Sequence, residues 1–270
     1  MRAVVAVLLF VAAAHAGLWG LLQEKQQAPD FHGVLPSISY TPFEPGHTVA
    51  DGDTEKVRND LKKFSTITRA VRLYTSTEGS ELVPPIAAEF GMKVMVGAWI
   101  GKDASRNSTE IEAAINLVRH NSNVVGVVVG NETIYRGEQK VEDLIELIKR
   151  VKKSVNVPVT SGEIYSIWSE NPELAYSVDF IAAHVLPYWE RHPANEAVDQ
   201  AVDRYQFLRN QFPGKRIMVA EFGWPSAGYN LGGAFPGAFA QATILRNFVN
   251  RAESIGMEYN IVEAVDQPWK

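Results

Sequence analysis

Short apolar runs alternate with amphipathic stretches from Phe31 to the end of the chain. The runs are rich in valine and isoleucine and have the length of buried strands, whereas the stretches between them repeat apolar residues at helical spacing. In the segment "VEDLIELIKRVKK" such residues recur every three or four positions and leave a charged outer face. The pattern predicts strands at residues 31–39, 68–76, 93–100, 124–132, 157–165, 178–186, 216–224 and 258–266, with helices that include residues 54–66, 108–121, 141–154 and 198–212.

Eight strands separated by helices predict an α/β fold of the (β/α)8 TIM-barrel type over residues 31–270. The alternative is an open doubly wound sheet, but no Gly-rich phosphate loop follows the first strand. One feature disagrees with a complete barrel, because the sequence stops at Trp269-Lys270 without an eighth helix. Either the sequence is a fragment or something else closes the barrel.

The first 22 residues differ from the rest in composition. Met1-Arg2 precedes "AVVAVLLFVAAAHAGLWGLL", which is long enough to span a bilayer as a helix. A signal peptide is the alternative, because Ala14-His15-Ala16 offers a small-x-small cleavage site. We favour a retained anchor, since apolar residues continue to Leu22 and Trp19 suits a membrane interface. Residues 23–30 then form a polar linker, and the domain lies outside the cytoplasm, in the periplasm or at the cell surface.

Composition and charge narrow the function. The net charge of −5 and the lack of a basic stripe argue against a nucleic-acid partner. The chain has no cysteine, which excludes disulfides, thiolate metal sites and a cysteine nucleophile. Its histidines are scattered, so we predict no catalytic metal and no cofactor.

In a parallel barrel the chemistry lies where the strands end. Two glutamates meet this condition, Glu132 after the valine run of the fourth strand and Glu221 at the end of the seventh. Paired carboxylates facing each other across a cleft can cleave a glycosidic bond, one protonating the leaving oxygen while the other attacks or activates water. Glu163 and Glu263 are alternatives for the acid if the strands end elsewhere.

Other residues at strand ends fit the same chemistry. Arg72 is placed to keep Glu221 ionised, and Tyr188 to donate a hydrogen bond to it. Asn131 is placed to donate to a sugar 2-hydroxyl. Aromatic rings stack on the apolar faces of sugars. The remaining candidates for substrate binding are therefore the aromatic residues at strand ends, namely Tyr40, Tyr74, Trp168, Trp189, Trp224 and Trp269.

Several motifs together resemble a known family. They are "SYTPFEPG", "VRLY", "VVVGNE", "LPYW" and above all "VAEFGWPSAG", in the first, second, fourth, sixth and seventh predicted strands. This set is similar to glycoside hydrolase family 17, the β-1,3-glucanases and β-1,3-glucanosyltransferases, and the resemblance runs from about Phe31 to the end. "EAVDQPWK" and the apolar N-terminus look most like bacterial, membrane-linked members, which make or remodel glucans.

The resemblance implies roles for individual residues. It makes Glu132 the acid/base, Glu221 the nucleophile, Asn131 a sugar contact and Tyr188 the phenol beside the nucleophile. It implies a β-glucan as substrate and a covalent intermediate that water (hydrolysis) or a sugar hydroxyl (transfer) resolves. A catalytically silent barrel that only binds glucan is the alternative, although such a site has no need of an acid opposite a nucleophile. Asn107-Ser108-Thr109 and Asn131-Glu132-Thr133 both fit the N-glycosylation pattern. The second would place a glycan on the proposed acid and is interpreted as a coincidence, and in a bacterium we expect neither to matter.

Overall fold

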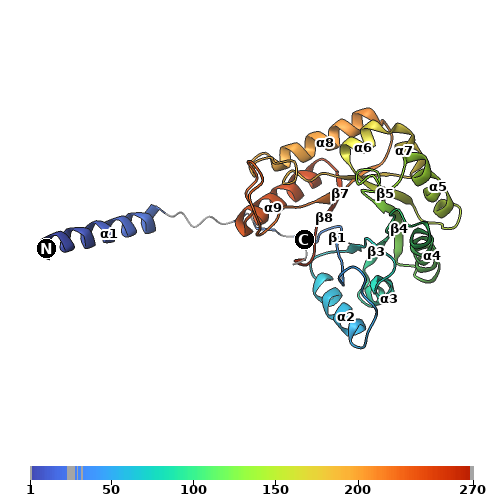
Figure 1. Ribbon diagram of the computed structural model, residues 1–270, viewed down its shortest axis with the longest axis horizontal. Coiled ribbons are helices and arrows are strands. Elements are labelled where there is room, and N and C mark those ends of the chain that lie inside the picture. Colours follow the sequence, from blue (N-terminus) through green and yellow to red (C-terminus); the bar gives the residue numbers. More distant parts are fainter. Residues whose placement is uncertain (1, 23–27, 29, 32, 268–270) are drawn as a thin grey trace.

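The computed structural model describes residues 2–22, 28, 30–31 and 33–267. Eight parallel strands close into a barrel in sequence order, so that each strand pairs with its neighbours along the chain and the last pairs with the first (Figure 1). The strands are β1 (Ile38–Ser39), β2 (Ala70–Arg72), β3 (Lys93–Ala98), β4 (Val124–Asn131), β5 (Val159–Ile164), β6 (Ile181–His184), β7 (Ile217–Phe222) and β8 (Glu258–Ile261). The predicted (β/α)8 TIM barrel is confirmed.

Helices connect the strands and surround the barrel (Figure 1). They are α2 (Asp53–Phe64), α3 (Val83–Glu89), α4 (Ala104–His120), α5 (Val141–Lys152), α6 (Tyr165–Glu170), α7 (Pro172–Ser177), α8 (Ala197–Gln211) and α9 (Ala238–Ser254), with a 3₁₀ turn at Ser80–Leu82. In α5 the apolar stripe packs inward through Leu144, Ile148 and Val151, as the periodicity predicts. Asp103 caps α4, because its carboxylate accepts hydrogen bonds from the backbone N–H groups of Ser105 and Arg106.

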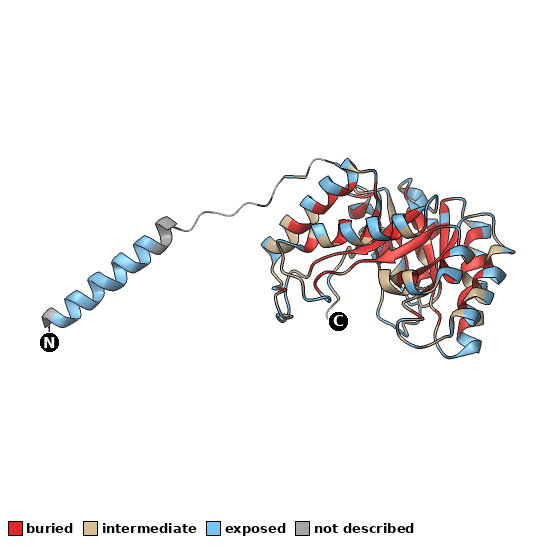
Figure 2. Ribbon diagram, turned by 90° about the horizontal axis from the view of Figure 1, so that it is seen from above, coloured by how far each residue is buried: buried red, intermediate tan, exposed pale blue. Residues whose placement is uncertain are grey.

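The core consists of two groups of side chains on opposite faces of the sheet. The larger fills the space between strands and helices and includes Val219 of β7. The smaller contains Phe180, Ala182, Met218 and Ala220. Because Met218 and Ala220 alternate with Val219, and successive side chains of a strand point to opposite faces, the two groups lie on the two sides of β7. Figure 2 shows the strands as the buried centre of the molecule.

The barrel closes even though β8 is the last strand of the sequence. Ile38 of β1 pairs in parallel with Ile261 of β8, and the backbone N–H groups of Ile261 and Ala264 donate to the carbonyls of Ser37 and Ser39. Side chains strengthen this closure inside the barrel, where Asn260 bonds to both Ser37 and Ser39. Pairing between β1 and β8 therefore closes the sheet within the part of the chain that the structure describes.

Helix α1 (Arg2–Leu22) covers the apolar N-terminal segment, and its apolar side chains between Val4 and Leu18 are exposed. Among the residues that the structure describes, no helix reaches the length and apolar character that a membrane crossing requires. The side chain of Trp19 and most of the predicted linker lie outside the described residues.

Candidate active site

Glu132 and Glu221 come from strands on different sides of the barrel and meet at its carboxyl-terminal end. Glu132 directly follows β4, and Glu221 is the penultimate residue of β7. One carboxylate oxygen of each glutamate and one ring nitrogen of His184 all lie within 4.8 Å of one another. The Glu221 side chain is 9% exposed and that of Glu132 20%, so both are largely shielded while Glu132 is the more open.

Arg72 supplies the positive charge beside Glu221. Its side chain is buried, and Nη1 lies 2.7 Å from Glu221 Oε1 and donates also to the carbonyl of Ala220. Burial alone would raise the pKa of Glu221. The charges of His184 and Arg72, with hydrogen bonds from Arg72 and Tyr74, outweigh burial and hold that pKa below its ordinary value. Glu221 is therefore set up to stay ionised.

The predicted placement of Arg72 beside Glu221 is confirmed, but the phenol in contact with this carboxylate is a different one. The Tyr188 hydroxyl donates to the backbone carbonyl of Tyr229, and its ring packs edge-on against Trp224. The prediction that Tyr188 bonds to Glu221 is thus wrong. Tyr74 makes that hydrogen bond instead, and its hydroxyl also lies 3.1 Å from Ser39 Oγ. Burial, and then the charge of Glu221, raise the pKa of Tyr74 and keep it a donor.

Glu132 occupies a left-handed backbone conformation, with φ of 54°. For a residue other than glycine this conformation costs about 1–3 kcal/mol and persists where its surroundings hold it. Gly130, two residues before it, is also left-handed, and a Cβ there would lie 2.5 Å from Thr133 Oγ1. The backbone N–H of Glu132 donates to the carbonyl of Gly162 in β5 at 2.6 Å. This turn places the Glu132 carboxylate beside His184, with an oxygen within 4.8 Å of one of Glu221.

His184 links the two glutamates and was not among the residues predicted from the sequence. Its Nδ1 lies 2.9 Å from Glu132 Oε1, and its Nε2 lies 3.2 Å from Arg72 Nη2 and 3.5 Å from Glu221 Oε1. The Nδ1–H of His184 is placed to donate to the Glu132 carboxylate, while Nε2 faces both the guanidinium of Arg72 and Glu221. The side chain has room because a Cβ at Gly162 would lie 2.8 Å from Nε2.

Arg72 also binds the side-chain amide of Asn131. Its Oδ1 accepts a hydrogen bond from Arg72 Nη2 at 2.9 Å. Its oxygen is therefore occupied, which leaves its NH2 group as the part that can donate to a ligand. The role of Asn131 as a sugar contact stays a prediction.

Glu132, His184 and Glu221 are also the set of side chains that could hold a metal among the residues described. The guanidinium of Arg72 already binds Glu221 and faces His184 Nε2, so a positive group occupies the place where a cation would sit. A divalent ion there would meet direct charge repulsion. The arrangement thus fits acid–base and nucleophilic chemistry better than metal binding.

The predicted aromatic platforms separate into core and surface residues. Trp168 is fully buried and donates its indole N–H to the carbonyl of Ala182, and Trp224 is buried and donates to Phe235. Tyr40 is fully buried with its hydroxyl on Asp60. These three rings belong to the core, so their prediction as substrate contacts is wrong. Trp189 is 59% exposed, and its role as a sugar contact stays a prediction, while Trp269 lies outside the described residues.

The two alternative acids take other places. Glu163 has no exposed surface, and its carboxylate accepts hydrogen bonds from the backbone N–H groups of Ile134 and Tyr135. Glu263, after β8, is half-buried and accepts from Gln267. The buried position of Glu163 excludes it as a group that reaches a substrate, even though burial raises its pKa to about 7.

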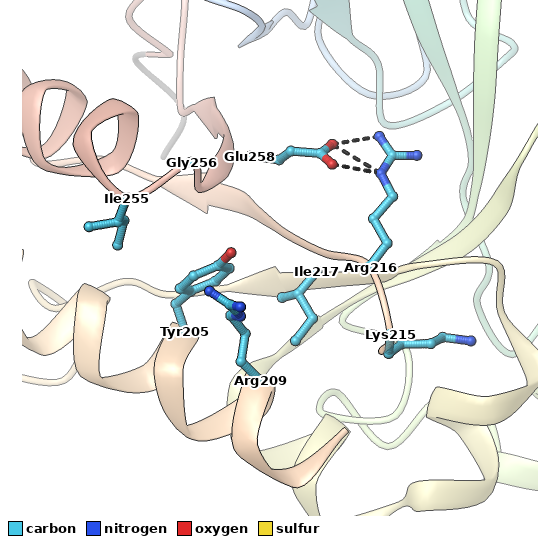
Figure 3. Close-up of a pocket in the computed structure, with 8 residues that line it drawn as sticks. All are labelled: Tyr205, Arg209, Lys215, Arg216, Ile217, Ile255, Gly256 and Glu258. Atoms are coloured by element: carbon cyan, nitrogen blue, oxygen red, sulfur yellow. Dashed lines mark hydrogen bonds and ion pairs between the residues drawn. The ribbon is translucent and has the colours of Figure 1, made fainter. Parts of the chain in front are cut away.

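A cavity of about 320 Å³ lies at the other end of the barrel (Figure 3). Its lining includes residues that immediately precede or begin β7 and β8, such as Arg216, Ile217 and Glu258. Arg216 and Glu258 bind each other there through several hydrogen bonds. Glu132 and Glu221 lie at the carboxyl-terminal ends of their strands, whereas this cavity lies at the amino-terminal ends of β7 and β8. The cavity is therefore separate from the candidate active site.

A (β/α)8 barrel with a pair of glutamates meeting at the ends of β4 and β7 defines a protein of the glycoside hydrolase class. Comparison with known families agrees. The model of the BtgE/BtgC glycoside hydrolase domain matches residues 37–270, and the chain belongs to this family.

Individual relatives point the same way. The chain is 25% identical over 279 residues to a probable glucan endo-1,3-beta-glucosidase, btgC, of Aspergillus terreus, a match that covers 90% of this chain and 42% of the relative. It is 25% identical over 272 residues to the btgC glucan endo-1,3-beta-glucosidase of Emericella nidulans, over 88% of this chain and 42% of the relative. The chain thus spans about two fifths of the length of these curated relatives.

Among solved structures, the glycoside hydrolase family 17 β-1,3-glucanosyltransferase of Rhizomucor miehei superposes with a TM-score of 0.79 at 25% identity, covering 87% of this chain and 88% of that one. An active-site mutant of that enzyme, solved with laminaritriose, gives a TM-score of 0.78 at 24% identity, with the same coverage. The resemblance to glycoside hydrolase family 17 is therefore confirmed.

Proposed function

We propose that this chain cleaves β-1,3-glucan through a two-glutamate double displacement. Glu132 protonates the glycosidic oxygen while Glu221 attacks the anomeric carbon, so the glycosidic bond breaks and a glycosyl ester forms on Glu221. Glu132, now a carboxylate, removes a proton from water or from a sugar hydroxyl, whose oxygen replaces Glu221. The product is a shortened chain in the first case and a transferred chain in the second.

The observation that carries the proposal is the short separation between the two carboxylates. Oxygens of Glu132 and Glu221 lie within 4.8 Å of each other. Retaining enzymes hold their carboxyl groups about 5–5.5 Å apart, whereas inverting enzymes need about 6.5–9.5 Å to admit a water molecule. The lowered pKa of Glu221 supports its role as the nucleophile, because the attacking group must be ionised.

The substrate follows from the relatives, which are named for 1,3-β-glucan, and from the structure solved with laminaritriose. The exposed ring of Trp189, in the loop that follows β6, offers a face for a sugar. We also propose that the domain acts outside the cytoplasm, with residues 1–22 as its signal peptide or anchor.

The test is a product analysis with the full chain and a laminari-oligosaccharide of defined length. We expect the wild type to convert it and Glu221→Gln to lose turnover while it folds and still binds the oligosaccharide. Glu132→Gln should lose turnover as well. Glu138→Gln is the matched control, because Glu138 lies in the same loop and pairs with Arg136 on its surface. Its activity should stay close to wild type.

The product lengths then distinguish the two activities. Products longer than the substrate indicate transfer, and shorter products alone indicate hydrolysis. Binding without conversion by the wild type would contradict the proposal and favour a barrel that only binds glucan. Loss of activity in Glu221→Gln through unfolding would contradict its assignment as the nucleophile.

A further inference from the structure

Glu163 is a buried carboxyl that the proposed chemistry does not use. It lies in β5 and has no exposed surface. Oε1 accepts from the backbone N–H of Ile134 at 2.8 Å, and Oε2 from that of Tyr135 at 3.3 Å. Both amides belong to the turn that immediately follows Glu132. Burying a carboxyl costs free energy, and the two hydrogen bonds from these amides offset that cost.

The turn that presents Glu132 is attached to β5 at three points. The N–H of Glu132 donates to the carbonyl of Gly162, and the N–H groups of Ile134 and Tyr135 donate to the Glu163 carboxyl. Glu132 has a left-handed backbone, which a residue with a side chain keeps where its neighbours constrain it. Two consecutive residues of β5 therefore hold the backbone on both sides of the Glu132 side chain.

The pKa of Glu163 also depends on the charge of Glu132. Burial, followed by the negative charge of Glu132, raises its pKa, while the two amide hydrogen bonds and the charge of Arg136 lower it. Arg136 belongs to the same turn, where it donates to the carbonyl of Ile100 and pairs with Glu138. The two carboxyls are thus close enough to interact although only Glu132 reaches the cleft.

We propose that Glu163 is a positioning residue for the acid/base: by accepting the amides of Ile134 and Tyr135, it fixes the turn from which Glu132 delivers its proton. The proposal rests on the proposed function. If Glu163 has this role, its loss should affect the acid/base and spare the nucleophile. Loosening this turn impairs proton delivery to the leaving oxygen, whereas Arg72, Tyr74 and Glu221 on the opposite side stay in place. The defect should therefore depend on how much the leaving group needs a proton.

The experiment compares two donors on the full chain, using kcat/KM, which reports formation of the glycosyl-enzyme. One donor is a laminari-oligosaccharide, whose sugar leaving group needs protonation. The other is a 2,4-dinitrophenyl β-laminaribioside, whose phenolate leaves without it. In Glu163→Gln the amide has one acceptor for two N–H donors. We expect kcat/KM to fall about 10- to 100-fold with the oligosaccharide, as for a misplaced catalytic group, and less than about 3-fold with the aryl glycoside.

Glu163→Asp is the second variant, because it keeps the charge but shortens the reach to the two amides. It should show the same dependence on the leaving group. Glu110→Gln is the matched control. Glu110 is another buried carboxyl that accepts two backbone amides, those of Ser76 and Trp99, and neither amide belongs to the turn after Glu132. Whatever activity this control loses should be lost equally with both donors.

The outcomes separate this proposal from the one it rests on. A wild type inactive on both donors refutes the proposed function itself. With an active wild type, an equal loss on both donors in Glu163→Gln and Glu163→Asp, or no loss on either, refutes the positioning role. Failure of both variants to fold would show that Glu163 serves the stability of the barrel, and would refute it too.

Discussion

Replacing Arg72 with methionine removes the guanidinium that lies 2.7 Å from Glu221 Oε1 and leaves a buried carboxylate without its partner. Two unit charges about 4 Å apart attract by about 4 kcal/mol at an effective dielectric constant near 20. Removing one member of a buried pair costs about 3–5 kcal/mol. Methionine fills a similar volume, so most of this loss is electrostatic. We expect the unfolding free energy to drop by about 3–5 kcal/mol near neutral pH.

The loss should depend on pH with a defined sign. Because the folded-state pKa of Glu221 is lowered, its contribution to stability is fully present above the ordinary value of 4.5 and is lost as the pH falls through the folded value. In Arg72→Met burial raises the pKa of Glu221, so the deficit should begin to shrink above the ordinary value of 4.5 as the carboxyl is protonated in the variant, and shrink further as the pH falls through the wild-type folded value. In activity, the acid limb of the pH profile should move to higher pH.

The assay is urea unfolding of the wild type, Arg72→Met, Glu221→Gln and the double variant, at about pH 7 and about pH 4. In the Glu221→Gln background, Arg72→Met should cost less than about 1 kcal/mol or even stabilise, since both charges are then gone. An equal loss in both backgrounds, or a loss independent of pH, would refute the electrostatic reasoning and leave packing as the cause.

Three further changes test other parts of the structure. Gly162→Ala places a Cβ 2.9 Å from Arg72 Nη2 and should lower the unfolding free energy by about 1–3 kcal/mol, together with kcat; a wild-type melting curve would contradict it. Trp168→Ala should cost about 3–5 kcal/mol of stability, because the Trp168 ring is fully buried. Trp189→Ala should leave stability near wild type and raise KM for long oligosaccharides, because the Trp189 ring is exposed. The reverse pattern would exchange the roles of the two residues. Burial raises the pKa of Glu163 to about 7. The protonated carboxyl therefore contributes to stability below pH 4.5, and this contribution, up to about 3 kcal/mol, is lost as the pH rises through 7. Glu163→Gln should abolish this pH dependence of the unfolding free energy, measured by urea unfolding.

The strands and the two glutamates were predictable because they depend on local patterns. A parallel barrel strand is buried on both faces, so it appears as a continuous apolar run, and a carboxylate at its end stands out. β4 shows this directly, since its valines lead to Asn131 and Glu132. The closure between β1 and β8 followed from the number of strands, although no eighth helix was expected.

What could not be predicted depends on which way a side chain points in three dimensions. His184 ends the apolar strand β6 and has no spacing motif that ties it to Glu132. Position at a strand end does not decide whether an aromatic ring enters the core or the cleft. Trp168 lies within α6 and donates its indole N–H to Ala182 of β6, whereas Trp189, in a loop, remains exposed. For the same reason Tyr74, and not Tyr188, contacts Glu221.

The loop after β3 has a practical consequence for producing the protein. Asn107 is buried in α4 and uses both ends of its amide, with Oδ1 accepting from the N–H of Gly101 and Nδ2 donating to the carbonyl of Gly101. Its sequon, Asn107-Ser108-Thr109, is a substrate for the glycosylation machinery of a eukaryotic secretory pathway while the chain is still unfolded. A glycan attached there would occupy the place of this loop, so yeast or mammalian secretion should trap misfolded chains. Bacterial expression should avoid the trap, and so should a Thr109→Ala variant, which removes the sequon and keeps both hydrogen bonds of the Asn107 amide.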